Sequence, residues 1–234
     1  MAQTRSEELQ LKDSQLTCAA KTSVILPAYN ERDRIGAVLA AVKQARLADE
    51  IIVVSDGSTD GTYELVAADP DVKAIRLDTN RGKGAAMYVG AQNTDADILL
   101  FLDADLVGMD GEKVDALIEP VSQNRADMAI GIFKGGRGPT DLAQFIAPYI
   151  SGQRSLRRDV FLSIPGIDSV RSGVETAITR YFRSHGLRIE RVPLVGCTHY
   201  MKEEKLGVLR GFASRLRMYA EIGSIILDGR RFRA

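Results

Sequence analysis

The stretch ILLFLDADL, residues 98–106, runs from a block of apolar residues directly into two carboxylates, Asp103 and Asp105. A short apolar run of this kind predicts a buried β-strand. A carboxylate is too costly to bury unpaired, so we expect this pair at the tip of the strand, close to positive charge. Because hard divalent cations bind clustered carboxylate oxygens, we favour a cation site over two carboxylates that simply face solvent.

The same order of strand and helix repeats on the N-terminal side of this stretch. Apolar runs at residues 23–27, 50–56 and 72–77 alternate with segments whose apolar residues follow helical spacing. Continuous apolar strands separated by helices indicate a mostly parallel sheet that is covered on both faces. We therefore expect an α/β, Rossmann-like fold.

The order loosens after Asp105. The elements that we expect there are a helix at 111–123, a strand at 127–133, a helix at 173–184 and a strand at 187–196. Residues 151–161 (SGQRSLRRDVF) are Arg-rich and have no regular period, so we expect an irregular segment. The glycine-rich loop from Lys134 to Pro139 is a candidate lid over a bound donor.

Composition limits the cellular setting and the class of partner. Apolar residues make up 45% of the chain, and its 31 basic and 31 acidic residues cancel, which gives no argument for a nucleic-acid partner. Two cysteines far apart, no signal peptide and no apolar stretch of membrane-spanning length indicate a cytoplasmic protein. We expect a flexible tail at residues 1–20 and a single domain at 21–234.

Polar residues follow four of the expected strands. Asn30, Asp56, Lys83 and Asp103 all come shortly after an apolar run. Each alone is ordinary turn or helix-cap chemistry. Ligands of open α/β sheets bind beyond the carboxyl ends of the strands, so the coincidence of all four predicts a ligand site at that edge.

Several rival motifs fail on single residues. A calcium loop of the EF-hand type that starts at Asp56 would need a glutamate where Ala67 stands. The dinucleotide fingerprint that begins at Gly82 has Met87 in place of its last glycine. The chain also has no GxxxxGK[ST] and no GxSxG motif, which argues against a P-loop enzyme and a serine hydrolase.

Four blocks carry a family resemblance: PAYNE (27–31), VVSDGSTDGT (53–62), NRGKGAA (80–86) and FLDADL (101–106). In this order and spacing they resemble nucleotide-sugar glycosyltransferases of the GT-A fold, family-two type. Residues 150–200 resemble, more weakly, the glucosyl-3-phosphoglycerate synthases, which share that fold. The resemblance implies a nucleotide-binding half at about 21–106 and an acceptor half at about 107–234.

The resemblance also implies roles for residues in the first half. The residues expected to line the nucleoside pocket are Pro27, Ala28, Tyr29, Glu31 and Asp56. Lys83 would lie beside the diphosphate, where a cation offsets negative charge.

Asp103 would face the ribose, and Asp105 would bind Mg²⁺ or Mn²⁺ and act in catalysis. The same resemblance makes His199 a further metal ligand. The alternative for His199 is a histidine satisfied by hydrogen bonds at the end of a strand.

Two groups in the second half have level alternatives. Glu175 stands three residues after Ser172, which is a capping-box pattern, but the resemblance brings this region to the acceptor, where Glu175 would bind or act in acid–base catalysis. Arg154, Arg157 and Arg158 suit an anionic acceptor because guanidinium forks bind phosphate and carboxylate. Solvated surface charge is the alternative.

The C-terminal segment sets Leu206, Leu209, Phe212 and Leu216 at helical spacing. Such an amphipathic helix packs on its own domain, on a second copy in a homodimer, or on a membrane surface. A membrane surface would suit a polyprenyl-phosphate acceptor.

These observations predict a metal-dependent transfer of a hexosyl group from a nucleoside-diphosphate sugar to a small acceptor. UDP is the favoured nucleotide, and the acceptor is expected to be anionic, for example phosphorylated. One alternative is a polyprenyl-phosphate glycosyltransferase at the membrane surface, and another is a nucleotide-sugar binding protein without turnover. A nucleotidyltransferase is disfavoured because its glycine-rich N-terminal signature is missing.

Overall fold

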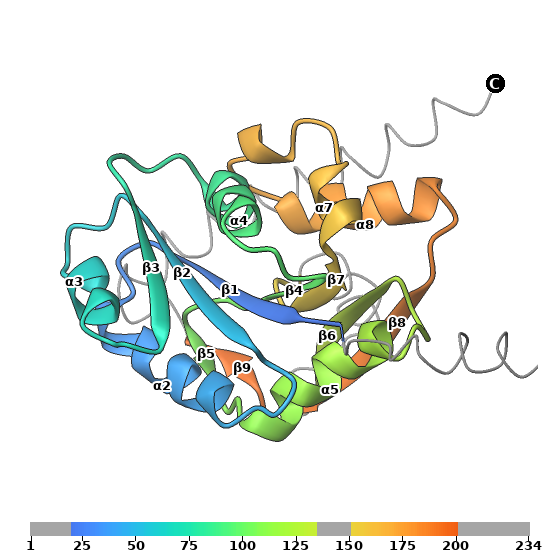
Figure 1. Ribbon diagram of the computed structural model, residues 1–234, viewed down its shortest axis with the longest axis horizontal. Coiled ribbons are helices and arrows are strands. Elements are labelled where there is room, and N and C mark those ends of the chain that lie inside the picture. Colours follow the sequence, from blue (N-terminus) through green and yellow to red (C-terminus); the bar gives the residue numbers. More distant parts are fainter. Residues whose placement is uncertain (1–19, 135–150, 201–234) are drawn as a thin grey trace, which may run out of the picture.

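The computed structural model describes residues 20–134 and 151–200 as one seven-stranded sheet with helices around it (Figure 1). The strands of the sheet are β1 (Thr22–Ala28), β2 (Glu50–Asp56), β3 (Val72–Leu77), β4 (Ile98–Phe101), β6 (Met128–Lys134), β7 (Arg154–Arg157) and β8 (Ile189–Val195). The helices are α2 (Arg32–Lys43), α3 (Thr62–Ala67), α4 (Lys83–Gln92), α5 (Gly111–Ser122), α7 (Arg158–Leu162), α8 (Val174–Ser184) and the 3₁₀ helix η1 (Ile167–Ser169).

The strand order is β3-β2-β1-β4-β7-β6-β8. Parallel pairing joins β1 to β2 and β4, β2 to β3, and β6 to β8. β7 runs antiparallel to both of its neighbours, β4 and β6. Two short strands, β5 (Leu106–Val107) and β9 (Thr198–His199), form a separate antiparallel ribbon. The predicted mostly parallel sheet is confirmed.

Buried apolar side chains form one cluster on each face of the sheet. One cluster packs the sheet against α2 and α5, and the other packs it against α4, α7 and α8 (Figure 1). Along β4, Leu100 belongs to the first cluster, whereas Leu99 and Phe101 belong to the second, because side chains alternate along a strand. The expected α/β architecture with helices on both faces is therefore confirmed.

One expected segment differs from the structure. Residues 151–161, predicted to be irregular, contain β7 and most of α7, and β7 is an interior strand of the sheet between β4 and β6. Its four residues are RSLR, in which only Leu156 is apolar. A strand this short, with arginines at both ends, lacks the apolar run by which buried strands are recognised.

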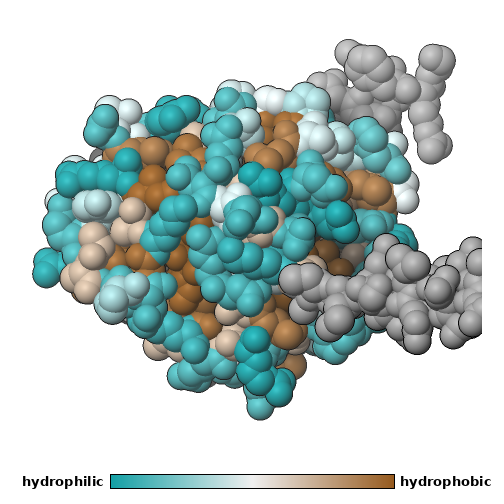
Figure 2. All heavy atoms as spheres, in the orientation of Figure 1, coloured by the Kyte–Doolittle hydropathy of each residue, from teal (hydrophilic) through white to brown (hydrophobic). Residues whose placement is uncertain are grey.

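Some predictions concern residues outside the described part of the chain. These are the tail at 1–19, residues 135–139 of the candidate lid and the C-terminal amphipathic helix. Within the described residues, none of the helices has the length and apolar character needed to span a bilayer. Figure 2 shows hydrophilic and hydrophobic residues intermixed on the face seen in Figure 1, which is usual for a folded domain.

Candidate functional site

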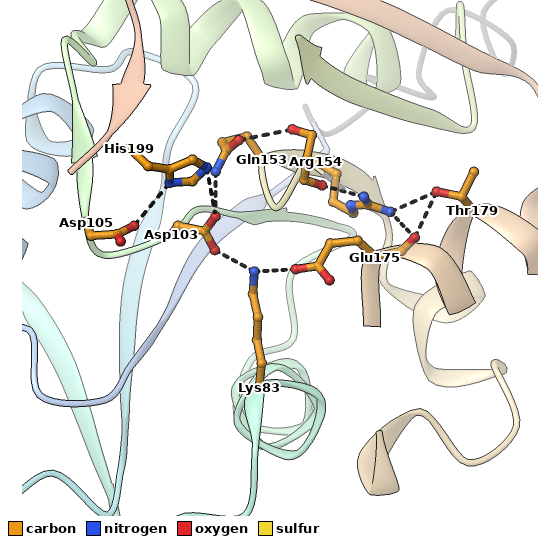
Figure 3. Close-up of polar contacts among 9 residues, drawn as sticks. Lys83, Asp103, Asp105, Gln153, Arg154, Glu175, Thr179 and His199 are labelled. Carbon is orange, nitrogen blue, oxygen red and sulfur yellow. Dashed lines mark hydrogen bonds and ion pairs between the residues drawn. The ribbon is translucent and has the colours of Figure 1, made fainter. Parts of the chain in front are cut away.

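Side chains from four separate segments meet beyond the carboxyl end of β4 (Figure 3). Lys83 is the first residue of α4, and Glu175 lies in the first turn of α8. Asp103 and Asp105 follow β4 directly, and His199 belongs to β9. The pairing of Leu106 with His199 in the small ribbon brings the histidine to the two aspartates. All five were predicted site residues.

Lys83 joins two carboxylates that come from different halves of the chain. Its Nζ donates to Asp103 Oδ1 at 2.5 Å and to Glu175 Oε1 at 2.5 Å. Burial alone would lower the pKa of Lys83, but the charges and hydrogen bonds of the two carboxylates outweigh it and raise this pKa above its ordinary value. Lys83 therefore carries a positive charge at neutral pH at the centre of the site.

Asp103 is held through both of its carboxylate oxygens. Oδ1 accepts the bond from Lys83, and Oδ2 accepts a hydrogen bond of 2.8 Å from Gln153 Nε2. Burial would raise the pKa of Asp103, but the charges of Lys83 and His199, with the hydrogen bonds, lower it below the usual value. The backbone of Gly152 lies so close that an added Cβ would stand 2.3 Å from Oδ2. Only glycine fits there.

Asp103, Asp105 and His199 each offer one ligand atom, and these atoms all lie within 4.8 Å of one another. His199 Nδ1 is 3.2 Å from Asp105 Oδ1, and its Nε2 is 3.8 Å from Asp103 Oδ2. Burial would lower the pKa of His199, but the hydrogen bond to Asp105 and the two negative charges raise it. Two carboxylates with one imidazole are a donor set that fits Mn²⁺ or Mg²⁺.

The loops that follow β1 and β2 are fastened to each other. Asn30, with a left-handed backbone (φ 56°), donates its N–H to Ser58 Oγ at 3.1 Å, and its side chain accepts from Thr59 N at 2.9 Å. The N–H of Glu31 donates to Thr62 Oγ1 at 3.0 Å. The hydroxyl and amide groups of the two motifs therefore hold these neighbouring loops together.

The predicted nucleoside-pocket residues lie at the end of β1 and just beyond it. Pro27 and Ala28 close the strand, and Ala28 is buried. Tyr29 is 48% exposed, so its ring is open to a ligand. The Glu31 carboxylate pairs with Arg34 at 2.6 Å, and Arg34 in turn lies over the ring of Tyr200.

Asp56 shapes the turn that carries Lys83. Its carboxylate accepts hydrogen bonds from the backbone N–H groups of Arg81 at 2.7 Å and Gly82 at 2.8 Å. The next amide, that of Gly84, donates to Val170 O at 3.1 Å. This end of α4 therefore packs against the chain itself, and the Lys83 side chain is the group that it presents to the site.

Arg154 lies behind the site. Its side chain is fully buried, and its guanidinium donates to the backbone oxygens of Ser151 and Glu175. The prediction that Arg154 binds an anionic acceptor is therefore wrong, because a guanidinium enclosed in this way is occupied by the protein. Arg157 is exposed and pairs with Asp159, as expected for surface charge.

The structure excludes one of the two interpretations of Glu175. A capping box would need a hydrogen bond from the cap side chain, but α8 is capped by Gly173 without one. The Glu175 carboxylate instead bonds Lys83. The capping-box interpretation is contradicted, and Glu175 belongs to the cluster.

Sequence reasoning missed three residues around the site. Gln153 donates to Asp103, the backbone of Gly152 lies against Asp103, and Arg34 connects Glu31 with Tyr200. Gln153 and Gly152 lie just before β7, the strand that the sequence pattern did not reveal. No local signal marks them, because their roles depend on where β7 inserts.

Comparison with known proteins places these features in context. The profile of glycosyl transferase family 2 matches residues 23–182, more than half of the chain. An undecaprenyl-phosphate 4-deoxy-4-formamido-L-arabinose transferase of Yersinia pestis is 40% identical over 95 residues. That alignment covers 37% of this chain and only 29% of the relative's length.

Solved structures of glucosyl-3-phosphoglycerate synthase from Mycobacterium tuberculosis are similar over most of the chain. The complex with Mn²⁺, UDP and glucosyl-3-phosphoglycerate has a TM-score of 0.66 at 26% identity, over 85% of this chain and 81% of that one. The complex with Mg²⁺ and UDP has a TM-score of 0.65 at 26% identity, over 85% and 80%. The similarity extends to the second half, where Glu175 and His199 lie.

Proposed function

The chain belongs to glycosyl transferase family 2, and we propose that it transfers a hexosyl group from a UDP-sugar to an acceptor that carries a phosphate. The observation that carries this proposal is the meeting of Asp103, Asp105 and His199 beside Lys83 and Glu175. In the reaction, the bond between the anomeric carbon and the diphosphate breaks, and a bond from that carbon to an acceptor oxygen forms. This exchange needs groups that bind the departing diphosphate and a carboxylate for the acceptor, on opposite sides of one site.

We assign the divalent cation to Asp105 and His199. Both oxygens of Asp103 are already engaged by Lys83 and Gln153, which suits a residue that orients the donor, for example at the ribose. When bound, the cation offsets the negative charge of the departing diphosphate. The solved structures of the mycobacterial synthase, which contain Mn²⁺ or Mg²⁺ with UDP, support a divalent cation in this site.

We assign the remaining contacts to the donor from the positions of the residues in the fold. Pro27, Ala28, Tyr29 and Glu31 lie at the end of β1, where we propose that the nucleoside binds. Asp56 supports this region through the turn before α4. The positive charge of Lys83 is suited to a diphosphate oxygen, because charge-assisted hydrogen bonds are stronger than neutral ones.

Glu175 is the carboxylate that we assign to the acceptor side. It reaches the cluster from α8, which belongs to the second half of the chain. Where the acceptor attacks through a hydroxyl, a carboxylate at this position can take up the proton. Where it attacks through a phosphate oxygen, no proton has to be removed, and Glu175 would act by orienting the acceptor.

Two acceptors follow from the comparisons. The synthase complexes contain phosphoglyceric acid, a small soluble phosphate, and their similarity covers both halves of this chain. The Yersinia relative is named for undecaprenyl phosphate, but its alignment covers only 37% of this chain. We therefore favour a soluble phosphorylated acceptor and keep a polyprenyl phosphate as the second candidate.

Thermal unfolding in the presence of UDP-sugars tests donor binding. A ligand at 100 times its Kd stabilises the folded state by about 2.7 kcal/mol, so a UDP-sugar with Mn²⁺ should raise the Tm clearly. Asp105→Asn should abolish the part of the shift that needs metal. Asp95→Asn is the matched control, since Asp95 is exposed and pairs with Lys21. A wild-type chain that no UDP-sugar stabilises with either metal would refute the proposal.

Product formation separates the two acceptors. UDP-glucose with Mn²⁺ is supplied with phosphoglyceric acid in one reaction and with undecaprenyl phosphate in detergent micelles in another. Transfer to phosphoglyceric acid alone supports the favoured acceptor, and transfer to the micellar lipid alone supports the second. Metal-dependent stabilisation with hydrolysis of the donor but no transfer to either would leave the donor assignment standing and remove both acceptors.

A further inference from the structure

Arg154 combines complete burial with contacts to the backbone beside the site. Its relative exposure is 0%, and among the described residues it is the largest of the fully buried side chains. Nη1 donates to Glu175 O at 2.9 Å and to Thr179 Oγ1 at 3.3 Å, while Nη2 donates to Ser151 O. Its Nε has no hydrogen-bond partner among the described residues. The guanidinium thus connects the segment before β7 with the first turn of α8.

Stability alone is a poor explanation for this arginine. Burial lowers the pKa of Arg154 to about 10, although the charges of Glu175 and Asp103 act in the other direction. No carboxylate pairs with it directly among the described residues, and a buried ion without a direct partner costs free energy that an apolar residue of similar size would not. Because burial of this cation is costly, we infer that the guanidinium serves to hold its neighbours in position.

The carbonyl that Arg154 holds belongs to the residue whose side chain enters the site. Glu175 accepts from Arg154 through its backbone and from Lys83 through its carboxylate. The neighbouring residue Gln153 holds Asp103, the other carboxylate on Lys83 (Figure 3). Gln153, just before β7, and Arg154, the first residue of β7, therefore fix the two ends of the Asp103–Lys83–Glu175 bridge.

We propose that Arg154 is a positioning residue, whose guanidinium fork ties the first turn of α8 to Ser151 and so sets where the Glu175 carboxylate lies relative to Lys83. The inference rests on the proposed function, because it gives Glu175 its task on the acceptor side. A planar fork is required, since one group must reach two backbone oxygens in different directions. Lysine, with a single ammonium, cannot reproduce this geometry.

Hydrogen exchange tests the placement in the full chain without any ligand. Arg154→Met keeps the length of the side chain and removes the fork. Because a hydrogen bond to a charged group contributes about 1.5–3 kcal/mol, the amides of Thr176 and Ala177, which donate to Gly173 O, should exchange about tenfold faster or more. Arg154→Lys should fall between Arg154→Met and the wild type.

Arg188→Met is the matched control. Arg188 also donates to a backbone oxygen, that of Asn124 at 2.9 Å, but it lies just before β8, is exposed and pairs with Asp127 as well. Its loss should leave exchange in α8 unchanged. Unchanged exchange in both Arg154 variants, or equal acceleration in the Arg188 variant, would overturn the assignment.

Kinetics then test the consequence for transfer. A displacement of about 1 Å at a reacting group can reduce turnover about 10²-fold, so Arg154→Met should lower kcat to that extent while the KM for the UDP-sugar stays within about twofold. If Arg154 acts through Glu175, then Arg154→Met combined with Glu175→Gln should be no slower than Glu175→Gln alone. Effects that multiply would mean that the two residues act independently.

The two failures can be told apart. A wild-type chain that transfers nothing and binds no UDP-sugar would refute the proposed function, and the exchange experiment would still decide whether Arg154 holds α8. A wild-type chain that transfers a hexosyl group while Arg154→Met matches its kcat would refute the positioning role alone.

Discussion

The half of the sheet built on β1 to β4 and the half built on β6 to β8 bring residues to the site in different ways. In the first half, Asp56 is the last residue of β2 and Asp103 comes two residues after β4, so their positions are set by these parallel strands. In the second half, Gln153 and Arg154 arrive with an antiparallel strand that inserts between β4 and β6, and Glu175 arrives with a helix. The site residues of the first half are thus fixed by local order along the chain, and those of the second half by long-range packing.

Lys83 is the point where the two arrangements depend on each other. It comes from the first half and bonds one carboxylate of each half. Burying two carboxylates at this place without it would leave negative charges unpaired. We therefore predict that a substitution of Lys83 disturbs site residues of both halves, whereas a substitution elsewhere in the site disturbs residues of one half.

The largest effect is expected from Lys83→Met. Loss of a single charge-stabilising donor at a reacting site lowers turnover about 10²–10³-fold. Loss of hydrogen bonds to charged groups should also cost about 2–3 kcal/mol of stability, which lowers the Tm by roughly 5–10 °C for a domain of this size. Donor turnover and thermal unfolding measure the two effects.

Lys73→Met is the control for this change. Lys73 is exposed and donates to Asn93 O on the surface of the first half. It should leave turnover and Tm at wild-type values. If Lys83→Met were equally harmless, the bridge between the halves would have no energetic meaning.

The next effect in size is expected from Gly152→Ala. Its Cβ would stand 2.3 Å from Asp103 Oδ2, so either the carboxylate or the start of β7 has to move, at about 1–3 kcal/mol as for other overpacked positions. Affinity for Mn²⁺ with a UDP-sugar should fall together with stability. Calorimetric titration and thermal unfolding check these two outcomes.

Gly36→Ala is the control for Gly152→Ala. Gly36 lies in α2, is exposed and has no atom within 4 Å of an added Cβ. Alanine in the middle of a helix is more stable than glycine by roughly 0.5–1 kcal/mol, so this variant should gain stability and keep its affinity. A loss from Gly36→Ala, or none from Gly152→Ala, would contradict the described packing.

The same contrast explains what the sequence could predict. The strands β1 to β4 could be predicted from apolar runs, and the residues at their ends from turn chemistry. Because ligands of open α/β sheets bind beyond the carboxyl ends of the strands, Lys83, Asp103 and Asp105 were correctly predicted to lie together. His199 and Glu175 were found through family resemblance, because nothing in their local sequence distinguishes them from a strand-end histidine and a capping residue. Their meeting depends on the β5–β9 ribbon and on α8.

Arg154 shows why the rest could not be predicted. An arginine in a charged segment is usually solvated surface, and RSLR has no period that indicates a strand. Its burial results from the insertion of β7 between two other strands, which is a property of the whole sheet. Gln153 and Gly152 were missed for the same reason.

A smaller effect is expected from acid, and its sign follows from Asp103. The pKa of Asp103 is lowered in the folded state, so its contribution to stability is present above the ordinary carboxyl value of about 3.9 and is lost as the pH falls through the folded value. Below about pH 5, where His199 is already protonated, the stability difference between the wild type and Asp103→Asn should therefore shrink as the pH falls, mainly below roughly pH 4. Denaturant unfolding at a series of pH values from about 5 downward measures it. A difference that grew on acidification over this range would reverse the assigned sign.

The smallest effect is expected where the same chemistry occurs at the surface. Arg125 pairs with Glu190 at 2.7 Å in the second half, with side chains that are 46% and 35% exposed. The distance resembles that of the Lys83 bonds, but solvent screens this pair and lets both side chains move, so Arg125→Met should change the free energy of unfolding by less than about 0.5 kcal/mol. Urea unfolding of this variant beside Lys83→Met compares two ion pairs of similar length. Equal losses would mean that distance rather than burial sets their strength, and the special place of Lys83 between the halves would then lose its physical basis.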